Sequence, residues 1–276
     1  MNYNSPKEIS EILELRGFSP QKKYGQNFLV SKNVREQILS LIDVKPGHKI
    51  WEIGPGLGSV TSLLSESLSE GKLTVFEIDR GFASFLRDSF RDSIEIVEGD
   101  MLKTWKKYRD ENGMPDRIFG NLPYNAAAVM ITTLIEEKAV PEKMVFTIQK
   151  EVAQRMIAPP GCREYSSFSV ICRVACDIKI EADIQGGAFY PVPDVTSSII
   201  SMTPHSLYSS LENRKKFSQF LRILFNSRRK TVLNNLKVFG KDKADEALER
   251  AGISPGIRAD NLDVGQIVSL YEKVYS

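Results

Sequence analysis

The fold is decided by residues 50–58, whose sequence is Ile-Trp-Glu-Ile-Gly-Pro-Gly-Leu-Gly. A short apolar run of this kind is typical of a buried strand, and the glycines after it let the backbone turn sharply and approach a ligand closely. Ser59, directly after the third glycine, is expected to cap the helix that follows. The stretch therefore predicts a strand, a tight turn at a ligand, and a helix.

Strand and helix patterns alternate along most of the chain. Short apolar, β-branched or aromatic runs recur at 50–53, 73–76, 94–97, 118–119 and 144–148. Stretches with helical spacing separate them, which predicts right-handed crossovers and a mostly parallel sheet with helices on both faces. Such an α/β sheet binds its ligand beyond the C-terminal ends of its strands.

Both ends of the chain depart from this alternation. Ser5 and Pro6 open a helix that is expected to run to about residue 16, and a second helix is expected over 34–42. The later runs 178–180 and 198–202 have no long helix between them, so they are expected to form an antiparallel pair. Beyond them the spacing is helical only. We therefore expect two domains, the first over 1–204 and a small all-helical one over 205–276.

Acidic residues at the ends of the predicted strands indicate the cofactor. Glu77 follows an apolar run, where a carboxylate accepts hydrogen bonds from both hydroxyls of a bound ribose. Dinucleotide-binding dehydrogenases share this combination with a glycine-rich loop. Glu52 in the first strand and Asp100 after the third favour S-adenosylmethionine, with Asp100 placed to accept from the adenine amino group. Asp100 also fits an N-cap for a helix starting at Met101, and the two roles are compatible.

The tetrapeptide Asn121-Leu122-Pro123-Tyr124, after the run 118–119, indicates the methyl acceptor. An exocyclic amine on an aromatic base delocalises its lone pair into the ring, so attack on a sulfonium methyl needs the nitrogen bent towards tetrahedral geometry. The Asn121 side chain and the Leu122 backbone oxygen can each accept an amine hydrogen, Pro123 fixes their placement, and Tyr124 can stack on the base. Together with the cofactor motifs, this predicts an S-adenosylmethionine-dependent N-methyltransferase.

Composition excludes several other classes. With 42% hydrophobic residues, the 276-residue chain can bury a large core and a smaller second one. The three cysteines lie far in sequence from the two histidines, which excludes a zinc site and makes histidine-based nucleophilic catalysis improbable. The longest nearly apolar stretch, 126–135, is too short to span a bilayer, and the N-terminus is acidic where a signal peptide is basic. We expect a cytoplasmic monomer without a metal.

Positive charge gathers near the C-terminus. Seven basic residues between Arg214 and Lys230 occur without an acid, among them the adjacent Arg228, Arg229 and Lys230. Such clustering neutralises phosphates, so these three residues are candidates for contacts with RNA and 205–276 for an RNA-docking domain. A solvated helix face, or internal bracing between the two domains, is the alternative.

A series of motifs follows in order along nearly the whole chain. They are Gly25-Gln26-Asn27-Phe28-Leu29, the stretch 52–58, Glu77-Ile78-Asp79, the stretch 120–125, Gln149-Lys150-Glu151-Val152-Ala153, Phe189-Tyr190-Pro191-Val192-Pro193 and Arg228-Arg229-Lys230-Thr231. In these motifs the chain resembles the ribosomal RNA adenine N6,N6-dimethyltransferases of the small-subunit type. This resemblance implies a class I, Rossmann-like methyltransferase sheet of seven strands with a small helical C-terminal domain, and a role in subunit biogenesis. It implies that Asn27, Leu29, Gly54, Glu77, Asp100 and Asn121 line the cofactor site, and that Phe189 and Tyr124 sandwich the target adenine.

Some positions depart from the family pattern, and other functions remain open. Ala126, Ser166, Asp194 and Thr196 differ from the usual residues, and Asp194 inverts a usual positive charge near the expected RNA contacts. A sister enzyme that methylates large-subunit RNA and gives antibiotic resistance shares the cofactor motifs. A non-catalytic ribosome-assembly factor on the same scaffold is a second alternative. A DNA adenine methyltransferase fits less well, because its motif has proline where this chain has Leu122.

Overall fold

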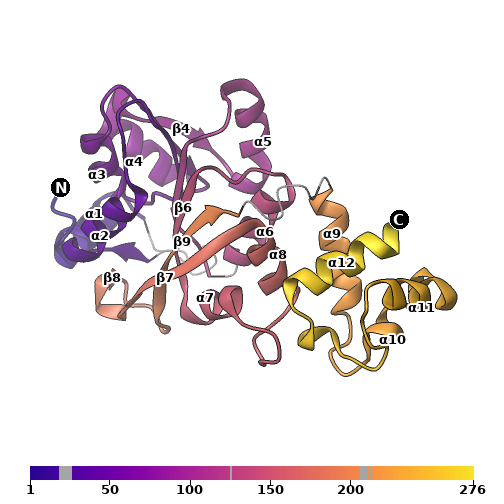
Figure 1. The fold of residues 1–276 in the computed structure, drawn as a ribbon. Coiled ribbons are helices and arrows are strands. Elements are labelled where there is room, and N and C mark those ends of the chain that lie inside the picture. Colours follow the sequence, from indigo (N-terminus) through magenta and orange to yellow (C-terminus); the bar gives the residue numbers. More distant parts are fainter. Residues whose placement is uncertain (19–26, 125, 206–210, 212) are drawn as a thin grey trace. The chain divides into compact units, whose positions relative to one another are not determined.

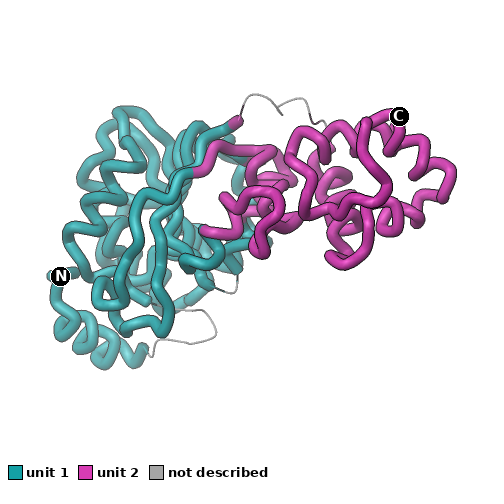
Figure 2. Tube along the Cα trace, turned by 60° about the horizontal axis from the view of Figure 1, so that its bottom comes forward, with its two compact units in different colours: residues 1–130, 140–153, 179–204 teal, residues 131–139, 154–178, 205–276 magenta. Residues whose placement is uncertain are grey.

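The computed structural model describes residues 1–18, 27–124, 126–205, 211 and 213–276. They form two compact units, which Figure 2 colours separately. Unit 1 holds residues 1–130, 140–153 and 179–204, and unit 2 holds residues 131–139, 154–178 and 205–276. The boundary expected after residue 204 stays a prediction, because residues 206–210 and 212 lie outside the described part of the chain.

Unit 1 is built on a twisted sheet (Figure 1). Its strands are β2 (Lys49–Ile53), β3 (Lys72–Glu77), β4 (Glu95–Glu98), β5 (Arg117–Asn121), β6 (Lys143–Gln149), β7 (Cys176–Ile184) and β9 (Ser197–Pro204). They lie in the order β4-β3-β2-β5-β6-β9-β7. The neighbours from β4 to β6 are parallel, and β9 is antiparallel to β6. The chain thus moves outward from β2 to β4 and then returns to the other side of β2, so the strand order reverses between β2 and β5, where α/β sheets bind ligands.

The last two strands confirm the expected pair. Neighbouring positions of β7 and β9 are joined by side chains: Ser198 donates to Asp183 at 2.7 Å, and Ser201 donates to Glu181 at 2.5 Å. From Ser198 to Ser201 along β9, the partner changes from Asp183 to the earlier residue Glu181 of β7. The two strands therefore run in opposite directions.

The helices of the chain lie where its apolar residues recur at helical spacing. They are α1 (Pro6–Leu15), α2 (Lys32–Ile42), α3 (Thr61–Ser67), α4 (Arg80–Phe90), α5 (Met101–Asn112), α6 (Ala127–Glu136), α7 (Lys150–Ile157), α8 (Ser167–Ala175), α9 (Arg214–Leu224), α10 (Val232–Leu236), α11 (Lys241–Arg250) and α12 (Val264–Tyr275). The Ser5 hydroxyl caps α1 by accepting from the Glu8 amide, as expected. The expectation for Ser59 was wrong: α3 begins at Thr61 behind Val60, and no side chain caps it.

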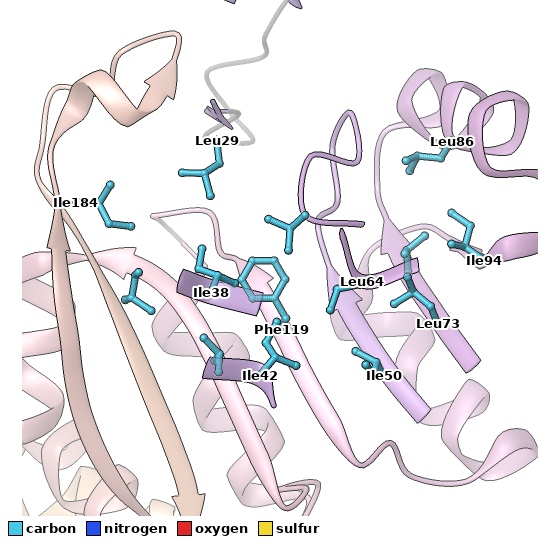
Figure 3. Packing of buried hydrophobic residues seen from close by; sticks show 14 of the residues in the cluster. Leu29, Ile38, Ile42, Ile50, Leu64, Leu73, Leu86, Ile94, Phe119 and Ile184 are labelled. Atoms are coloured by element: carbon cyan, nitrogen blue, oxygen red, sulfur yellow. The ribbon is translucent and has the colours of Figure 1, made fainter. Parts of the chain in front are cut away.

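Alternation along the strands divides the core between the two faces of the sheet. In β2, Ile50 belongs to a cluster with residues of α2, α3 and α4, such as Ile38, Leu64 and Leu86 (Figure 3). Its neighbour Trp51 points to the other face, where its ring lies 6.5 Å from that of Trp105 in α5. Both faces are therefore covered by helices, as a parallel sheet requires.

A second, two-stranded sheet joins segments far apart in the sequence. Strand β1 (Phe28–Leu29) pairs antiparallel with β8 (Phe189–Tyr190), and Leu29 lies opposite Phe189. Both side chains are buried in the same cluster as Ile50. This pairing holds the segment that begins at residue 27. Residues 19–26, which include Gly25 and Gln26 of the expected motif, lie outside the described residues.

Unit 2 is helical in its C-terminal part, as its spacing predicted. The rings of Phe217 and Phe220 in α9 lie 5.1 Å and 5.5 Å from that of Tyr271 in α12. The buried Tyr165 donates its hydroxyl to the Leu262 carbonyl at 2.9 Å, and so ties residue 165 to the C-terminal helices of the same unit.

Candidate functional site

A cavity opens at the C-terminal ends of the parallel strands in unit 1. Its volume is about 330 Å³. Ile53, at the end of β2, pairs with Phe76 of β3 and with Gly120 of β5, so the residues that follow these three strands meet at one edge of the sheet. Every residue expected to hold the cofactor lines this cavity: Asn27, Leu29, Gly54, Glu77, Asp100 and Asn121.

The glycine-rich loop is shaped by positive backbone angles and close neighbours. Gly56 and Gly58 have φ values of 57° and 83°, a region that side chains rarely tolerate. A β-carbon on Gly56 would lie 3.1 Å from the Phe28 ring, and one on Gly58 would lie 2.6 Å from the Phe90 ring. The loop is also held from outside, because Arg35 donates to the Ser59 carbonyl and Tyr3 to the Leu57 carbonyl, each at 3.1 Å.

We expect Gly58→Ala to lower the free energy of unfolding by about 1–3 kcal/mol, because the methyl group meets the Phe90 ring and the backbone angle disfavours alanine. Urea denaturation followed by circular dichroism measures this. Gly187→Ala is the matched control, since nothing lies within 4 Å of an added methyl there and its φ is not positive. Equal stability of the two variants would contradict the packing argument.

Glu77 joins the glycine-rich loop to the turn after β3. Its carboxylate is 3% exposed and accepts from the Gly56 amide at 3.1 Å and from the Asp79 amide at 2.8 Å. Burial raises the pKa of Glu77 to about 7, although both amides act in the opposite direction. The carboxylate is thus held in place by backbone donors while it lines the cavity.

Glu52 is a second buried acid of the cavity. It is 2% exposed, and its Oε2 has no hydrogen-bond partner among the described residues. Burial, and then the negative charge of Glu77, raise the pKa of Glu52 to about 8. A buried acceptor without a donor is costly unless a ligand supplies one. Glu52, with the buried carboxylate of Glu77 in the same cavity, therefore fits a ligand that carries both hydroxyl groups and positive charge, as S-adenosylmethionine does.

Asp100 has the N-cap role that its sequence context allowed, and it also lies at the cavity. Its Oδ1 accepts from the Leu102 amide at 3.0 Å and so caps α5. The residue also lines the cavity. The capping bond holds the side chain at the cavity wall. The carboxylate can still accept from a ligand, because it has further acceptor positions beyond the one that the Leu102 amide uses.

The Asn121 amide has a defined orientation. Its Nδ2 donates to the Asn27 backbone oxygen at 2.9 Å. Because a carbonyl oxygen can only accept, the amide must turn its NH₂ group to Asn27, and Oδ1 is left as the acceptor that Asn121 offers to the cavity. The next residues are held as well: the Leu122 amide donates to the Thr147 carbonyl at 3.0 Å, and the Pro123 carbonyl accepts from the Ala126 and Ala127 amides at 2.9 Å.

The residues expected to contact the acceptor are only partly brought together. Pro123 lines the cavity beside Asn121, whereas the Leu122 side chain is buried outside its lining. Tyr124 is half-buried and is not part of the lining, and its hydroxyl is hydrogen-bonded to that of Ser197. Phe189 is 2% exposed and packs in the core cluster, so its stacking on a base stays a prediction. Asn125 lies outside the described residues.

Several apolar residues of the wall were not anticipated. Ile78 and Met101 line the cavity directly after Glu77 and Asp100, and Ala126 and Met130 line it from the start of α6. Ile78 is 42% exposed, which is unusual for isoleucine. For Ile78 and Met101, the position directly after an acidic residue was the available signal.

The exposed basic residues of unit 2 differ in whether they are paired within the unit. Lys215 pairs with Glu137 at 2.7 Å, and Arg222 pairs with Glu136 at 3.5 Å. Arg228 donates to the Arg163 carbonyl at 2.5 Å and lies 3.7 Å from Asp260, so it braces its own unit. Arg229 and Lys230 are exposed, and neither pairs with an acid among the described residues.

Among the residues that the structure describes, no group of three or more His, Cys, Asp or Glu side chains is arranged to hold a metal ion. No helix of the described residues has the length and apolar character to cross a membrane.

The sheet order, the glycine-rich turn and the acids at the strand ends define a class I S-adenosylmethionine-dependent methyltransferase fold. Solved structures share it: a dimethyladenosine transferase from Plasmodium falciparum has a TM-score of 0.74 at 25% identity and covers 88% of this chain and 95% of its own. The 23S rRNA methyltransferase ErmE has a TM-score of 0.65 at 20% identity, covers 91% of this chain and all of its own, and is alike in fold.

The chain belongs to the ribosomal RNA adenine dimethylase family, whose model matches residues 17–275. Its sequence is 42% identical over 270 residues to ribosomal RNA small subunit methyltransferase A of Treponema denticola, covering 95% of this chain and 92% of the relative. The protein of the same name from Borreliella afzelii is 39% identical over 246 residues, covering 88% of this chain and 85% of the relative.

Proposed function

We propose that this chain transfers methyl groups from S-adenosylmethionine to N6 of adenosines in small-subunit ribosomal RNA, giving N6,N6-dimethyladenosine. The observation that carries the proposal is the Asn121 amide, which lines the cavity and whose NH₂ group is bound to the Asn27 carbonyl, so that its oxygen is left as an acceptor. An acceptor at this position suits an exocyclic amine. We infer the kind of RNA and the subunit from the names of the relatives, which are ribosomal RNA small subunit methyltransferases.

Different residues around the cavity bind different groups of the cofactor. Glu77 accepts from the ribose hydroxyls, Asp100 accepts from the adenine amino group, and Glu52 provides a negative charge beside the positively charged end. Asn27, Leu29 and Gly54 also line the cavity. When bound, S-adenosylmethionine supplies a methyl group on a positively charged sulfur, which is an activated electrophile.

The chain contributes orientation at the acceptor. Asn121 Oδ1 and the Leu122 carbonyl oxygen each accept one hydrogen of the adenine amine, which frees the nitrogen lone pair from the ring and directs it into the cavity. Such acceptors matter most as the nitrogen becomes tetrahedral, so they stabilise the transition state more than the bound substrate. Alignment of the reacting atoms provides much of the rate.

The alternatives receive less support. Likeness to the large-subunit enzyme is 20% in sequence and concerns the fold, whereas curated relatives at 36–42% identity are named for the small subunit. A purely non-catalytic assembly factor would not need the buried Glu77 or the oriented Asn121.

Incubation with labelled S-adenosylmethionine and a mixture of small and large subunits that lack the modification tests the proposal. The expected result is label in the small-subunit RNA, with dimethyladenosine found when the modified bases are mapped. Label in large-subunit RNA alone would support the first alternative, and absence of label under conditions of cofactor binding would support the second. Light scattering would test the expected monomer.

We further propose that unit 2 contacts RNA phosphates through Arg229 and Lys230, because both are exposed and neither is used in an ion pair among the described residues. Arg228 belongs to the same cluster, but its guanidinium is engaged with the Arg163 carbonyl and Asp260. Its contribution to RNA binding therefore stays a weaker prediction than that of its two neighbours.

Reversing both charges, Arg229→Glu with Lys230→Glu, is expected to weaken subunit binding and to reduce its salt dependence by about 1.5–2 in the slope of log affinity against log salt concentration. Filter binding over a salt series measures this. Lys241→Glu with Lys243→Glu is the control, because these exposed residues make the same charge change on α11. An unchanged slope in the first variant would exclude these phosphate contacts.

A further inference from the structure

The half-buried Tyr124 is anchored at the tip of its ring. Its hydroxyl lies 3.0 Å from the Ser197 hydroxyl. Ser197 is completely buried and begins β9, where it pairs in register with Gln149 of β6. Asn121, three residues before Tyr124, pairs with Thr147 of the same strand β6. The acceptor motif and its anchor are therefore held by neighbouring strands of one sheet.

The geometry of this hydrogen bond suits a stacking residue. Tyr124 lies in the connection between β5 and α6, outside any helix or strand. The hydrogen bonds of a helix or strand therefore do not hold its backbone, and the bond to Ser197 is what fixes the side chain. A phenol oxygen lies on the long axis of the ring. A hydrogen bond there fixes the direction of the axis and leaves both faces of the ring free for a base.

We propose that Ser197 is a positioning residue for methyl transfer, which holds the Tyr124 ring in the direction that stacks on the target adenine. This rests on the proposed function. Burial raises the pKa of Tyr124, so the phenol keeps its proton and remains able to bond to Ser197. Ser197 does not line the cofactor cavity and acts through its hydrogen bond to Tyr124.

Ser198 provides a matched control on the same strand. It is as completely buried as Ser197, but its hydroxyl donates to Asp183 at 2.7 Å. Ser198→Ala therefore makes the same chemical change in β9 and breaks a buried serine's hydrogen bond, here to a carboxylate, without touching the Tyr124 anchor.

The experiment is a double-mutant cycle with Ser197→Ala, Tyr124→Phe and both together. Single-turnover methylation of unmodified small subunits is measured at saturating S-adenosylmethionine and saturating subunits, with cofactor affinity from calorimetry and the melting temperature of each variant. Each single variant is expected to lose about tenfold in rate, as removal of one hydrogen bond allows. The double variant is expected to lose no more, because both changes break the same bond. Affinities for cofactor and subunits should stay within about twofold of wild type, and Ser198→Ala should keep the wild-type rate.

Three results would overturn the inference: a wild-type rate in Ser197→Ala, losses that multiply in the double variant, or an equal loss in Ser198→Ala. If Ser197→Ala does not fold, Tyr124→Phe still reads the same bond from its other end, and a wild-type rate there has the same consequence. A wild-type chain that binds the cofactor but leaves small subunits unmodified overturns the proposed function, and the inference with it.

Discussion

Asn121→Ala is expected to lower the single-turnover rate of methyl transfer by roughly 100- to 1000-fold, as found for the loss of one positioned polar group in other active sites. The reason is the amide orientation: Nδ2 donates to the Asn27 oxygen, so Oδ1 is the acceptor available to the amine. That acceptor is most important while the amine nitrogen changes geometry, so subunit affinity should fall much less than the rate.

The measurement needs saturating cofactor, because alanine also removes the bond to Asn27 in the cavity wall. Calorimetry on the variant reports that second effect separately. Asn112→Ala is the control, since this asparagine ends α5, bonds to Lys72 and to the Tyr108 carbonyl, and does not line the cavity. A single-turnover rate near wild type in Asn121→Ala would disprove the proposed acceptor mechanism.

Glu77→Ala is expected to weaken S-adenosylmethionine binding by about 1–3 kcal/mol, or roughly 5- to 150-fold, because it removes a charged acceptor. Glu98→Ala is the matched control: Glu98 pairs with Glu77 in register at the end of β4, but it forms ion pairs with Arg80 and Arg87 and lies outside the cavity lining. Calorimetry of both variants separates the two carboxylates, and equal affinities would remove Glu77 from the site.

The same carboxylate gives cofactor binding a pH dependence. The pKa values of Glu77 and Glu52, about 7 and about 8, lie above the ordinary value of 4.5. Below these values the folded protein keeps protons on both acids, so affinity for a ligand that needs ionised acceptors should rise between pH 6 and pH 8.5. Glu77→Gln should flatten the rise, and a wild-type affinity that is constant over this range would contradict the assignment.

The free energy of unfolding should fall as the pH rises from about 4.5 to about 8, whereas cofactor affinity rises over the upper part of this range. The unfolded chain releases the two protons near pH 4.5, whereas the folded chain retains them to about pH 7 and 8. The contribution of these acids to the free energy of unfolding is therefore greatest at low pH and is lost as the pH rises through the folded pKa values.

Most of the fold was predictable because its signals are local. Apolar runs such as 50–53 and 73–76 are strands β2 and β3, and Ser5 caps α1 as its spacing indicated. Because parallel strands end at one edge, Gly54, Glu77, Asp100 and Asn121 could be grouped before their contacts were known. The family and the methyltransferase fold implied by the motifs are confirmed.

The remainder depends on contacts between distant residues. Strands β1 and β8 have two residues each and are 160 positions apart, so no periodicity marks their pairing. Arg228 looks like its neighbours in sequence, and only the fold places Cys162, Arg163 and Asp260 around it. Ser59 was expected to be a cap because it follows glycine, but the helix starts two residues later.

The reversed direction of β9 also has a consequence for the length of chain that the site requires. At this edge of the sheet lie the last residues of the parallel strands, but the first residue of β9, which is Ser197. A parallel strand in the same place would need a crossover of a dozen or more residues to return the chain to the far edge first. One antiparallel strand thus brings a side chain from 73 residues further along beside Tyr124 without an additional helix.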